Sequence, residues 1–144
     1  MNTINLNNEK NVVGKSRTTG KAMNIVLWIV QILTAGLFFM AASGKFTGGP
    51  EMVKSFELIG LGQWFRYLTG IIEVVAAILL LTPRYSGLGA LLLIPTMIGA
   101  ILAHLVILGG SPAGGIIFLA ASLFIAWGRS EQIIDFINKY ITKK

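Results

Sequence analysis

The sequence predicts an all-α membrane protein: a four-transmembrane-helix bundle with a short outer interfacial helix and a C-terminal amphipathic tail. Composition is the first reason, because 54% of the 144 residues are hydrophobic and only 12% are charged, whereas charged residues make up about 25% of a soluble domain. The second reason is that four long apolar runs fill most of the chain, and a run of about 20 residues can cross a hydrocarbon core about 30 Å thick. A bilayer is therefore the expected environment.

The expected transmembrane domain covers residues 23–128 and contains four spans. They lie at about 24–44, 64–82, 87–108 and 112–127. Pro83 ends the second span because proline cannot continue a helix, and Pro95 predicts a kink in the third. Ser111 is the expected N-cap of the fourth span, with Pro112 at its first helical position.

Residues 1–22 form a polar, basic head without hydrophobic periodicity, and this pattern is typical of a disordered segment. A cleavable signal peptide is the competing interpretation of the first run, because small residues follow it. The apolar stretch, however, exceeds the roughly 7–15 residues of a signal-peptide core. We therefore expect the first run to be a span that is retained.

The distribution of basic residues predicts the orientation. One side of the membrane receives Lys10, Lys15, Arg17, Lys21, Arg84, Arg129, Lys139, Lys143 and Lys144, and the other receives Lys45, Lys54 and Arg66. Positively charged loops stay in the cytoplasm, so both termini are expected there, in a multi-pass protein of the bacterial plasma membrane. The net charge of +6 reflects this topology, and we expect no binding of nucleic acid.

Two segments outside the spans have helical periodicity. After a turn at residues 48–50, apolar residues recur at helical spacing, which predicts a short helix on the outer surface. These residues are Met52, Val53, Phe56 and Ile59. Residues 129–144 form the cytoplasmic amphipathic tail, with an apolar stripe and lysines for acidic lipid headgroups. The stripe is Ile133, Ile134, Ile137 and Ile141, and surface anchoring is favoured over a dedicated partner helix.

Five polar residues are the candidate ligand-binding positions: Gln31, Lys45, Arg66, Glu73 and His104. Ionisable groups are expensive in lipid, so those at membrane depth usually face a protein interior and are functional. Helical spacing puts Gln31 and Lys45 on one face of the first span and Arg66 and Glu73 on one face of the second. These faces are expected to meet, and Glu73 lies about 13 Å below the outer edge.

Each candidate also has a structural explanation. Gln31 can be a hydrogen bond between helices without chemistry. Lys45 and Arg66 lie at span ends, where snorkelling to the interface explains them. A structural hydrogen bond between Glu73 and His104 stays open beside a functional site. The sequence contains no cysteine, so disulfides and thiolate metal sites are excluded, and we expect no metal.

Several short motifs, in this order and spacing, resemble the DoxX-like family of small four-helix membrane proteins. They are Gly44-Lys45-Phe46, the stretch from Leu68 to Glu73, Pro83-Arg84, and the stretch from Ala100 to His104. The recurring polar positions of the family correspond to Lys45, Glu73 and His104. The resemblance implies association with quinone-linked membrane oxidoreductases or with resistance to oxidative stress, and a distant branch assists assembly of receptor channels.

Three functions stay open at this point. The first is a redox-associated subunit with an intramembrane pocket for a quinone or a similar ligand. Such a chain is expected to be an accessory subunit of a membrane oxidoreductase and not an enzyme that acts alone. Its partners would be the lipid bilayer, a membrane or soluble oxidoreductase subunit, and further copies if it forms a homo-oligomer. The second is a non-catalytic assembly factor or structural subunit. The third, a small-solute or proton carrier, lacks the internal repeat common in transporters. The sequence shows no cofactor-binding loop and identifies no catalytic residue.

Overall fold

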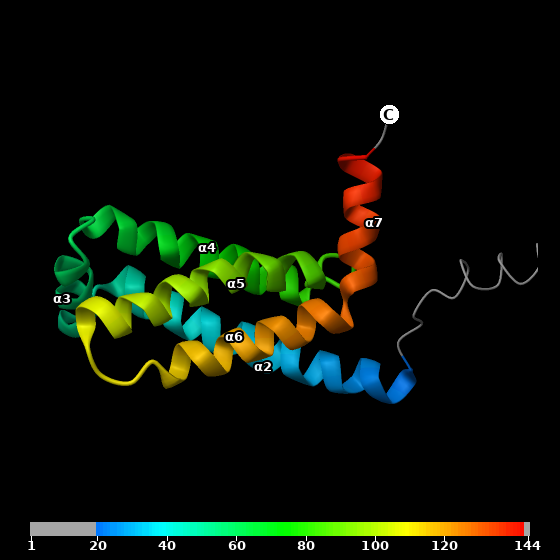
Figure 1. The fold of residues 1–144 in the computed structure, drawn as a ribbon, viewed down its shortest axis with the longest axis horizontal. Helices are drawn as coiled ribbons and strands as arrows, with labels where there is room; N and C mark the ends of the chain where they lie inside the picture. Colours follow the sequence, from blue (N-terminus) through cyan, green and yellow to red (C-terminus); the bar gives the residue numbers. More distant parts are fainter. Residues whose placement is uncertain (1–19, 143–144) are drawn as a thin grey trace, which may run out of the picture.

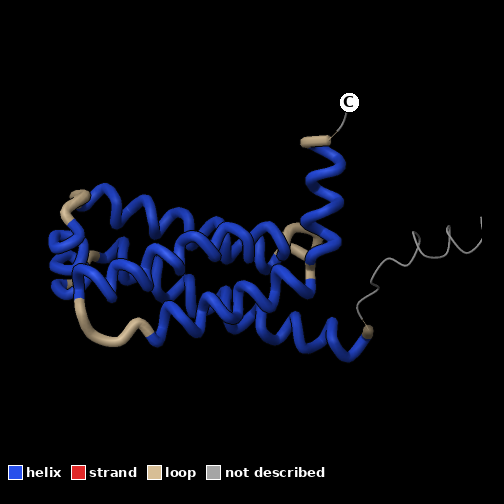
Figure 2. The backbone as a smooth tube through the Cα atoms, viewed as in Figure 1, coloured by secondary structure: helices blue, strands red, loops and turns tan. Residues whose placement is uncertain are grey.

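The computed structural model describes residues 20–142, and every regular element among them is a helix (Figures 1 and 2). The helices are α2 (Lys21–Thr47), α3 (Pro50–Ile59), α4 (Gln63–Leu81), α5 (Ser86–Ala103), α6 (Ala113–Gly128) and α7 (Ser130–Tyr140). A π-helical segment, η1 (His104–Leu108), continues α5 without a break. The expected all-α class is confirmed for this part of the chain.

Four long helices, α2, α4, α5 and α6, run side by side along the long axis of the molecule (Figure 1). The helix α4 packs between α2 and α5, and α6 packs chiefly on α5. The short helix α3 lies at one end of these helices, and α7 crosses the other end (Figure 1). We call these ends the α3 end and the α7 end.

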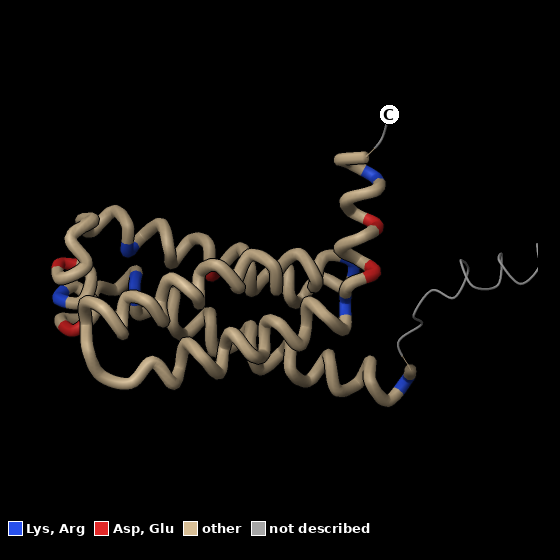
Figure 3. Tube along the Cα trace, in the orientation of Figure 1, with Lys and Arg blue, Asp and Glu red and all other residues tan. Residues whose placement is uncertain are grey.

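Within residues 20–142, three helices are long and apolar enough to cross a membrane: α2 with 27 residues, α4 with 19, and the joined α5–η1 with 23. A fourth span exists if α6 and α7, which are bent by 66° at their junction, count as one. The chain is therefore a multi-pass membrane protein. Charged residues gather near the two ends of the molecule, and few lie along the middle of the helices (Figure 3).

The core is built from small and aliphatic side chains because the helices approach closely. Ala35, Ala76, Ala77 and Ala90 are all fully buried. Gly89 is required where α5 crosses α4, since a Cβ there would lie 2.8 Å from the backbone oxygen of Ala76. Small residues permit such contacts in membranes, where packing drives association. Many large apolar side chains face outward, as lipid-facing residues do.

Local details differ from the sequence-based expectations at the helix ends. The helix α2 begins at Lys21 with Gly20 as its N-cap, so the last two residues of the expected head are helical, and residues 1–19 of the head lie outside the described residues. The fourth long helix begins at Ala113, with Pro112 in the N-cap position, one residue later than expected. Ser111 still accepts the Ala113 N–H, at 3.3 Å. The helix α5 continues through Pro95, and the π-helical segment at its end was not anticipated.

Candidate functional site

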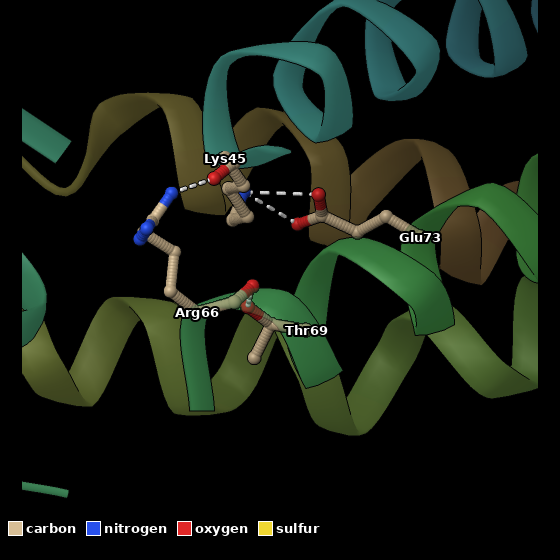
Figure 4. Close-up of polar contacts among 4 residues, drawn as sticks. All are labelled: Lys45, Arg66, Thr69 and Glu73. Carbon is tan, nitrogen blue, oxygen red and sulfur yellow. Dashed lines mark hydrogen bonds and ion pairs between the residues drawn. The ribbon is translucent and has the colours of Figure 1, made fainter. Parts of the chain in front are cut away.

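A buried ion pair joins α2 to α4 (Figure 4). The Lys45 ammonium donates hydrogen bonds to both carboxylate oxygens of Glu73, each at 2.9 Å. The Glu73 side chain is 4% exposed and that of Lys45 is 13% exposed. The structure thus brings together two residues that lie 28 positions apart in the sequence, with opposite charges and little access to solvent.

The backbone contact beside this pair explains why the two side chains can meet. Lys45 is in the last turn of α2, and Gly70 on α4 faces the same turn. A Cβ at Gly70 would lie 3.2 Å from the Phe46 ring and 3.5 Å from the Lys45 Cβ. The absence of a side chain at this position therefore lets α2 approach α4 closely enough for a direct ion pair.

Arg66 is buried, with 5% of its surface exposed, and it contacts the end of α2. Its Nη1 donates a hydrogen bond to the backbone oxygen of Lys45. A cation beside the last carbonyls of a helix is favoured by the helix dipole. The Arg66 guanidinium therefore lies at the α3 end, between the last turn of α2 and Gln63 at the start of α4. Snorkelling of Arg66 to the interface stays a prediction.

Gln63 extends these contacts to α3. Its Oε1 accepts a hydrogen bond from the Arg66 Nε at 2.8 Å, and its Nε2 donates one to the Val53 backbone oxygen at 3.2 Å. A continuous series of bonds therefore runs from α3 through Gln63 and Arg66 to Lys45 and its partner Glu73. Sequence reasoning did not single out Gln63, which precedes the apolar run and carries no charge.

His104 lies at the α3 end, where η1 begins and packs against α3. Its Nδ1 is 2.9 Å from the Ala100 backbone oxygen in the preceding helical turn. A carbonyl oxygen can only accept, so Nδ1 carries a proton and donates it. Among the described residues no hydrogen bond or ion pair joins His104 to Glu73, so the expected contact between them is not formed.

Gln31 lies in a second polar cluster at the α7 end. The cluster consists of Asn24, Gln31, Ser86 and Arg129. Gln31 is fully buried, donates to the Leu80 backbone oxygen at 2.8 Å and to the Ser86 hydroxyl at 3.0 Å, and accepts from the Arg129 Nε at 2.9 Å. It therefore joins three helices and the α6–α7 junction, and it is bonded to none of the other four candidates.

Arg129, Asn24 and Ser86 complete this second cluster, and only Gln31 was a candidate from the sequence. Arg129 contributes the charge. The Arg129 Nη1 donates to the Asn24 side-chain oxygen at 2.8 Å, and the Arg129 Cζ lies 5.7 Å from the centre of the Trp28 ring. In the sequence, Arg129 is only a basic residue at the end of an apolar run, and the excess of basic residues on the cytoplasmic side explains such a residue without a site. Ala35, Phe38 and Ala42 lie on α2 between the two clusters and are buried, so apolar packing separates them.

The Lys45–Glu73 pair can donate and accept hydrogen bonds to a small polar ligand. A lysine ammonium has three N–H donors, and the Glu73 oxygens accept two of them. Phe46, which follows Lys45 on α2, stacks on Tyr67, which follows Arg66 on α4, with ring centroids 6.3 Å apart. Both rings are partly exposed, at 40% and 43%. The Arg66 guanidinium lies over the Tyr67 ring, with its Cζ 4.4 Å from the ring centre, so the rings and the polar residues occupy the same end of the α2–α4 contact.

A metal centre finds no support in the described part of the chain. No group of three or more His, Cys, Asp or Glu side chains is placed there so that it could hold an ion. Carboxylate, imidazole and thiolate groups are the usual protein ligands of metals, and the sequence contains only one histidine and no cysteine.

The fold and this site define a class of protein: a small all-helical, multi-pass membrane protein with a buried lysine–glutamate pair between two of its long helices. A family model described as the DoxX-like family matches residues 29–129. The chain therefore belongs to the DoxX-like family, and the resemblance drawn from the sequence motifs is confirmed. Comparisons with curated proteins and with solved structures each find no match.

Proposed function

We propose that this protein is a redox-associated membrane subunit that binds a quinone or a similar small ligand beside the Lys45–Glu73 pair. The observation that carries the proposal is this pair itself, which is buried on apolar helices at a distance of 2.9 Å. Replacing a buried ion pair with apolar residues is often neutral or stabilising. A pair that stability alone does not require is a candidate for a role in binding or proton transfer.

The residues fit a quinone in three respects. The Lys45 ammonium has an N–H beyond the two that Glu73 accepts, and it would donate to a carbonyl oxygen. Glu73 would hold or release a proton beside that oxygen. The partly exposed rings of Phe46 and Tyr67 would provide a flat apolar surface. A bound quinone supplies two-electron chemistry, and the electrons would come from a partner oxidoreductase subunit.

The proposal includes a topology. We place α2, α4, α5–η1 and α6 across a bacterial plasma membrane as a four-span bundle, with both termini in the cytoplasm. The described basic residues at the α7 end are Lys21, Arg84, Arg129 and Lys139, and this excess favours the cytoplasmic side. The helix α3 would then lie on the outer surface, where its buried Phe56 packs on Phe65 with ring centroids 6.0 Å apart.

Thermal unfolding of the detergent-solubilised protein with a short-chain ubiquinone analogue tests the ligand. A ligand at 100 times its dissociation constant stabilises the folded state by about 2.7 kcal/mol, so the unfolding midpoint should rise. Glu73→Gln should abolish this rise. Glu57→Gln, which changes an exposed glutamate on α3, is the matched control and should keep it. Binding that is undetectable by calorimetry and native mass spectrometry would remove the proposal.

An assembly factor or structural subunit is the second candidate, and one observation favours it. The candidate polar residues already bond within the chain: Glu73 to Lys45, Arg66 to Gln63, and Gln31 to Ser86. If these bonds only shape the bundle for a partner, Glu73→Gln should reduce abundance or complex formation without changing any turnover. Affinity purification should then recover one partner in a fixed ratio.

A further inference from the structure

We infer that α7 is an interfacial helix whose apolar face binds the boundary between headgroups and acyl chains, and that it does not continue the α6 span. The inference depends on the membrane placement of the bundle proposed above and is independent of the ligand. The starting observation is the junction between α6 and α7, where the chain bends by 66° (Figure 1). A helix at this angle to a span lies closer to the membrane plane than to its normal.

The first turn of α7 is fixed to the turn between α4 and α5. The Gln132 side chain donates to the Pro83 backbone oxygen at 2.7 Å and accepts the Gly87 N–H at 3.0 Å. A Cβ at Gly87 would lie 2.9 Å from the Ile133 side chain and from the Arg129 backbone oxygen. These contacts set the direction of α7, so its bend is a property of the packed structure and not of a loose terminus.

Beyond this first turn, the helix extends away from the bundle (Figures 1 and 2). Its apolar side chains are exposed there: Ile134 by 54%, Ile137 by 40%, Tyr140 by 58% and Ile141 by 72%. Helical periodicity places them on the same side as Ile133, which packs on the bundle. The opposite side carries Glu131, Asp135, Asn138 and Thr142. The helix therefore has one apolar and one polar face.

Lipid is the occupant that the geometry favours for the apolar face. The face continues, through Ile133, from the end of a bundle whose own outer surface is apolar. The helix α6 has 16 residues, or about 24 Å at 1.5 Å per residue, and this is shorter than a hydrocarbon core of about 30 Å. The α6–α7 corner therefore reaches only the boundary region, where an amphipathic helix inserts its apolar face by about 5–10 Å.

Basic residues near this corner match the headgroup layer. Lys139 lies on the polar side of α7, and Arg84 lies in the adjoining turn between α4 and α5; both are exposed. Lys143 and Lys144 follow in the sequence, outside the described residues. Exposed basic side chains such as those of Arg84 and Lys139 can extend toward phosphates while their stems stay in the apolar boundary. An anionic bilayer surface is thus the partner that fits the apolar and the basic residues together.

Site-directed spin labelling can test the inference directly, because the chain contains no cysteine that would have to be removed. Nitroxides are attached to Ile137→Cys and Asn138→Cys in the full chain, reconstituted in phosphatidylcholine–phosphatidylglycerol vesicles. The Ile137 label should collide more often with oxygen, which dissolves in lipid, than with a water-soluble nickel complex. The Asn138 label should show the reverse preference. Ile141→Cys and Thr142→Cys form a second pair, beyond the contacts that fix the first turn.

Two results would overturn the inference. Labels on both faces that prefer the nickel complex would place α7 in water. A label at Ile137 or Ile141 that is shielded from both reagents would show that protein, such as a second copy, covers the face. Neither result depends on quinone, so a failed ligand test and a failed labelling test remain distinguishable.

Discussion

Replacing both members of the Lys45–Glu73 pair with methionine gives the sharpest test of the site. Glu73→Met leaves the Lys45 ammonium in its place without a counter-charge, and Lys45→Met leaves the carboxylate. At 2.9 Å and an effective dielectric constant of about 20, the attraction between unit charges is about 6 kcal/mol. Desolvation of both groups offsets most of it.

Removing one partner of a buried pair typically destabilises a protein by about 3–5 kcal/mol. The Lys45 side chain keeps 13% of its surface exposed, so relaxation toward solvent should hold the loss for Glu73→Met near about 3 kcal/mol. Lys45→Met leaves the Glu73 carboxylate, which is only 4% exposed, and its loss should lie nearer about 5 kcal/mol. The Met/Met double variant removes both charges and keeps similar volumes. Its free energy of unfolding should therefore return to within about 1 kcal/mol of the parent value.

Reversible unfolding in mixed micelles, followed by the fluorescence of the three tryptophans, measures these free energies. Lys54→Met, which changes an exposed lysine on α3, is the control and should alter stability by less than about 0.5 kcal/mol. Strict additivity of the two single substitutions, with a coupling energy under about 0.5 kcal/mol, would refute the coupling between Lys45 and Glu73. If the Met/Met variant is as stable as the parent but its unfolding midpoint no longer rises with the quinone analogue, the two charges are needed for ligand binding and not for folding.

Two further predictions concern packing and the second polar cluster. Gly89→Ala should destabilise the bundle by about 1–3 kcal/mol because its Cβ would lie 2.8 Å from the Ala76 backbone oxygen; Gly99→Ala on the same helix, where nothing lies within 4 Å, should be neutral in the same micelle assay. Gln31→Met should lower the free energy of unfolding by about 2 kcal/mol, since it removes the acceptor of the Arg129 guanidinium. An unchanged midpoint for either Gly89→Ala or Gln31→Met would contradict the corresponding contact.

Much of the fold could be predicted because hydropathy is a local property of the chain. The apolar run at residues 64–82 predicts a membrane-spanning helix from its own composition, and the structure forms α4 at Gln63–Leu81. The helical spacing of Arg66 and Glu73 similarly predicted that both face inward, and both are buried. The length of a helix and the side that it buries follow from residues within a few turns of one another.

The partners of the polar residues could not be predicted in the same way. The sequence left the partner of Glu73 open, with a bond to His104 as one possibility, and the close approach of α2 to α4 at Gly70 selected Lys45. Arg66 bonds to the last turn of α2, and His104 bonds to its own helix. Gln31 fell on the same helical face as Lys45, yet it lies in the other polar cluster.

The residues alone establish an all-helical membrane protein, the positions of its apolar runs and the inward faces of α2 and α4. Packing decided which polar groups on those faces meet. It also set the bend that carries α7 across the end of the bundle. The physical reason is range: helix formation and hydropathy depend on neighbours in the chain, whereas a hydrogen bond or an ion pair depends on distances of about 3 Å between helices that only the whole fold brings together.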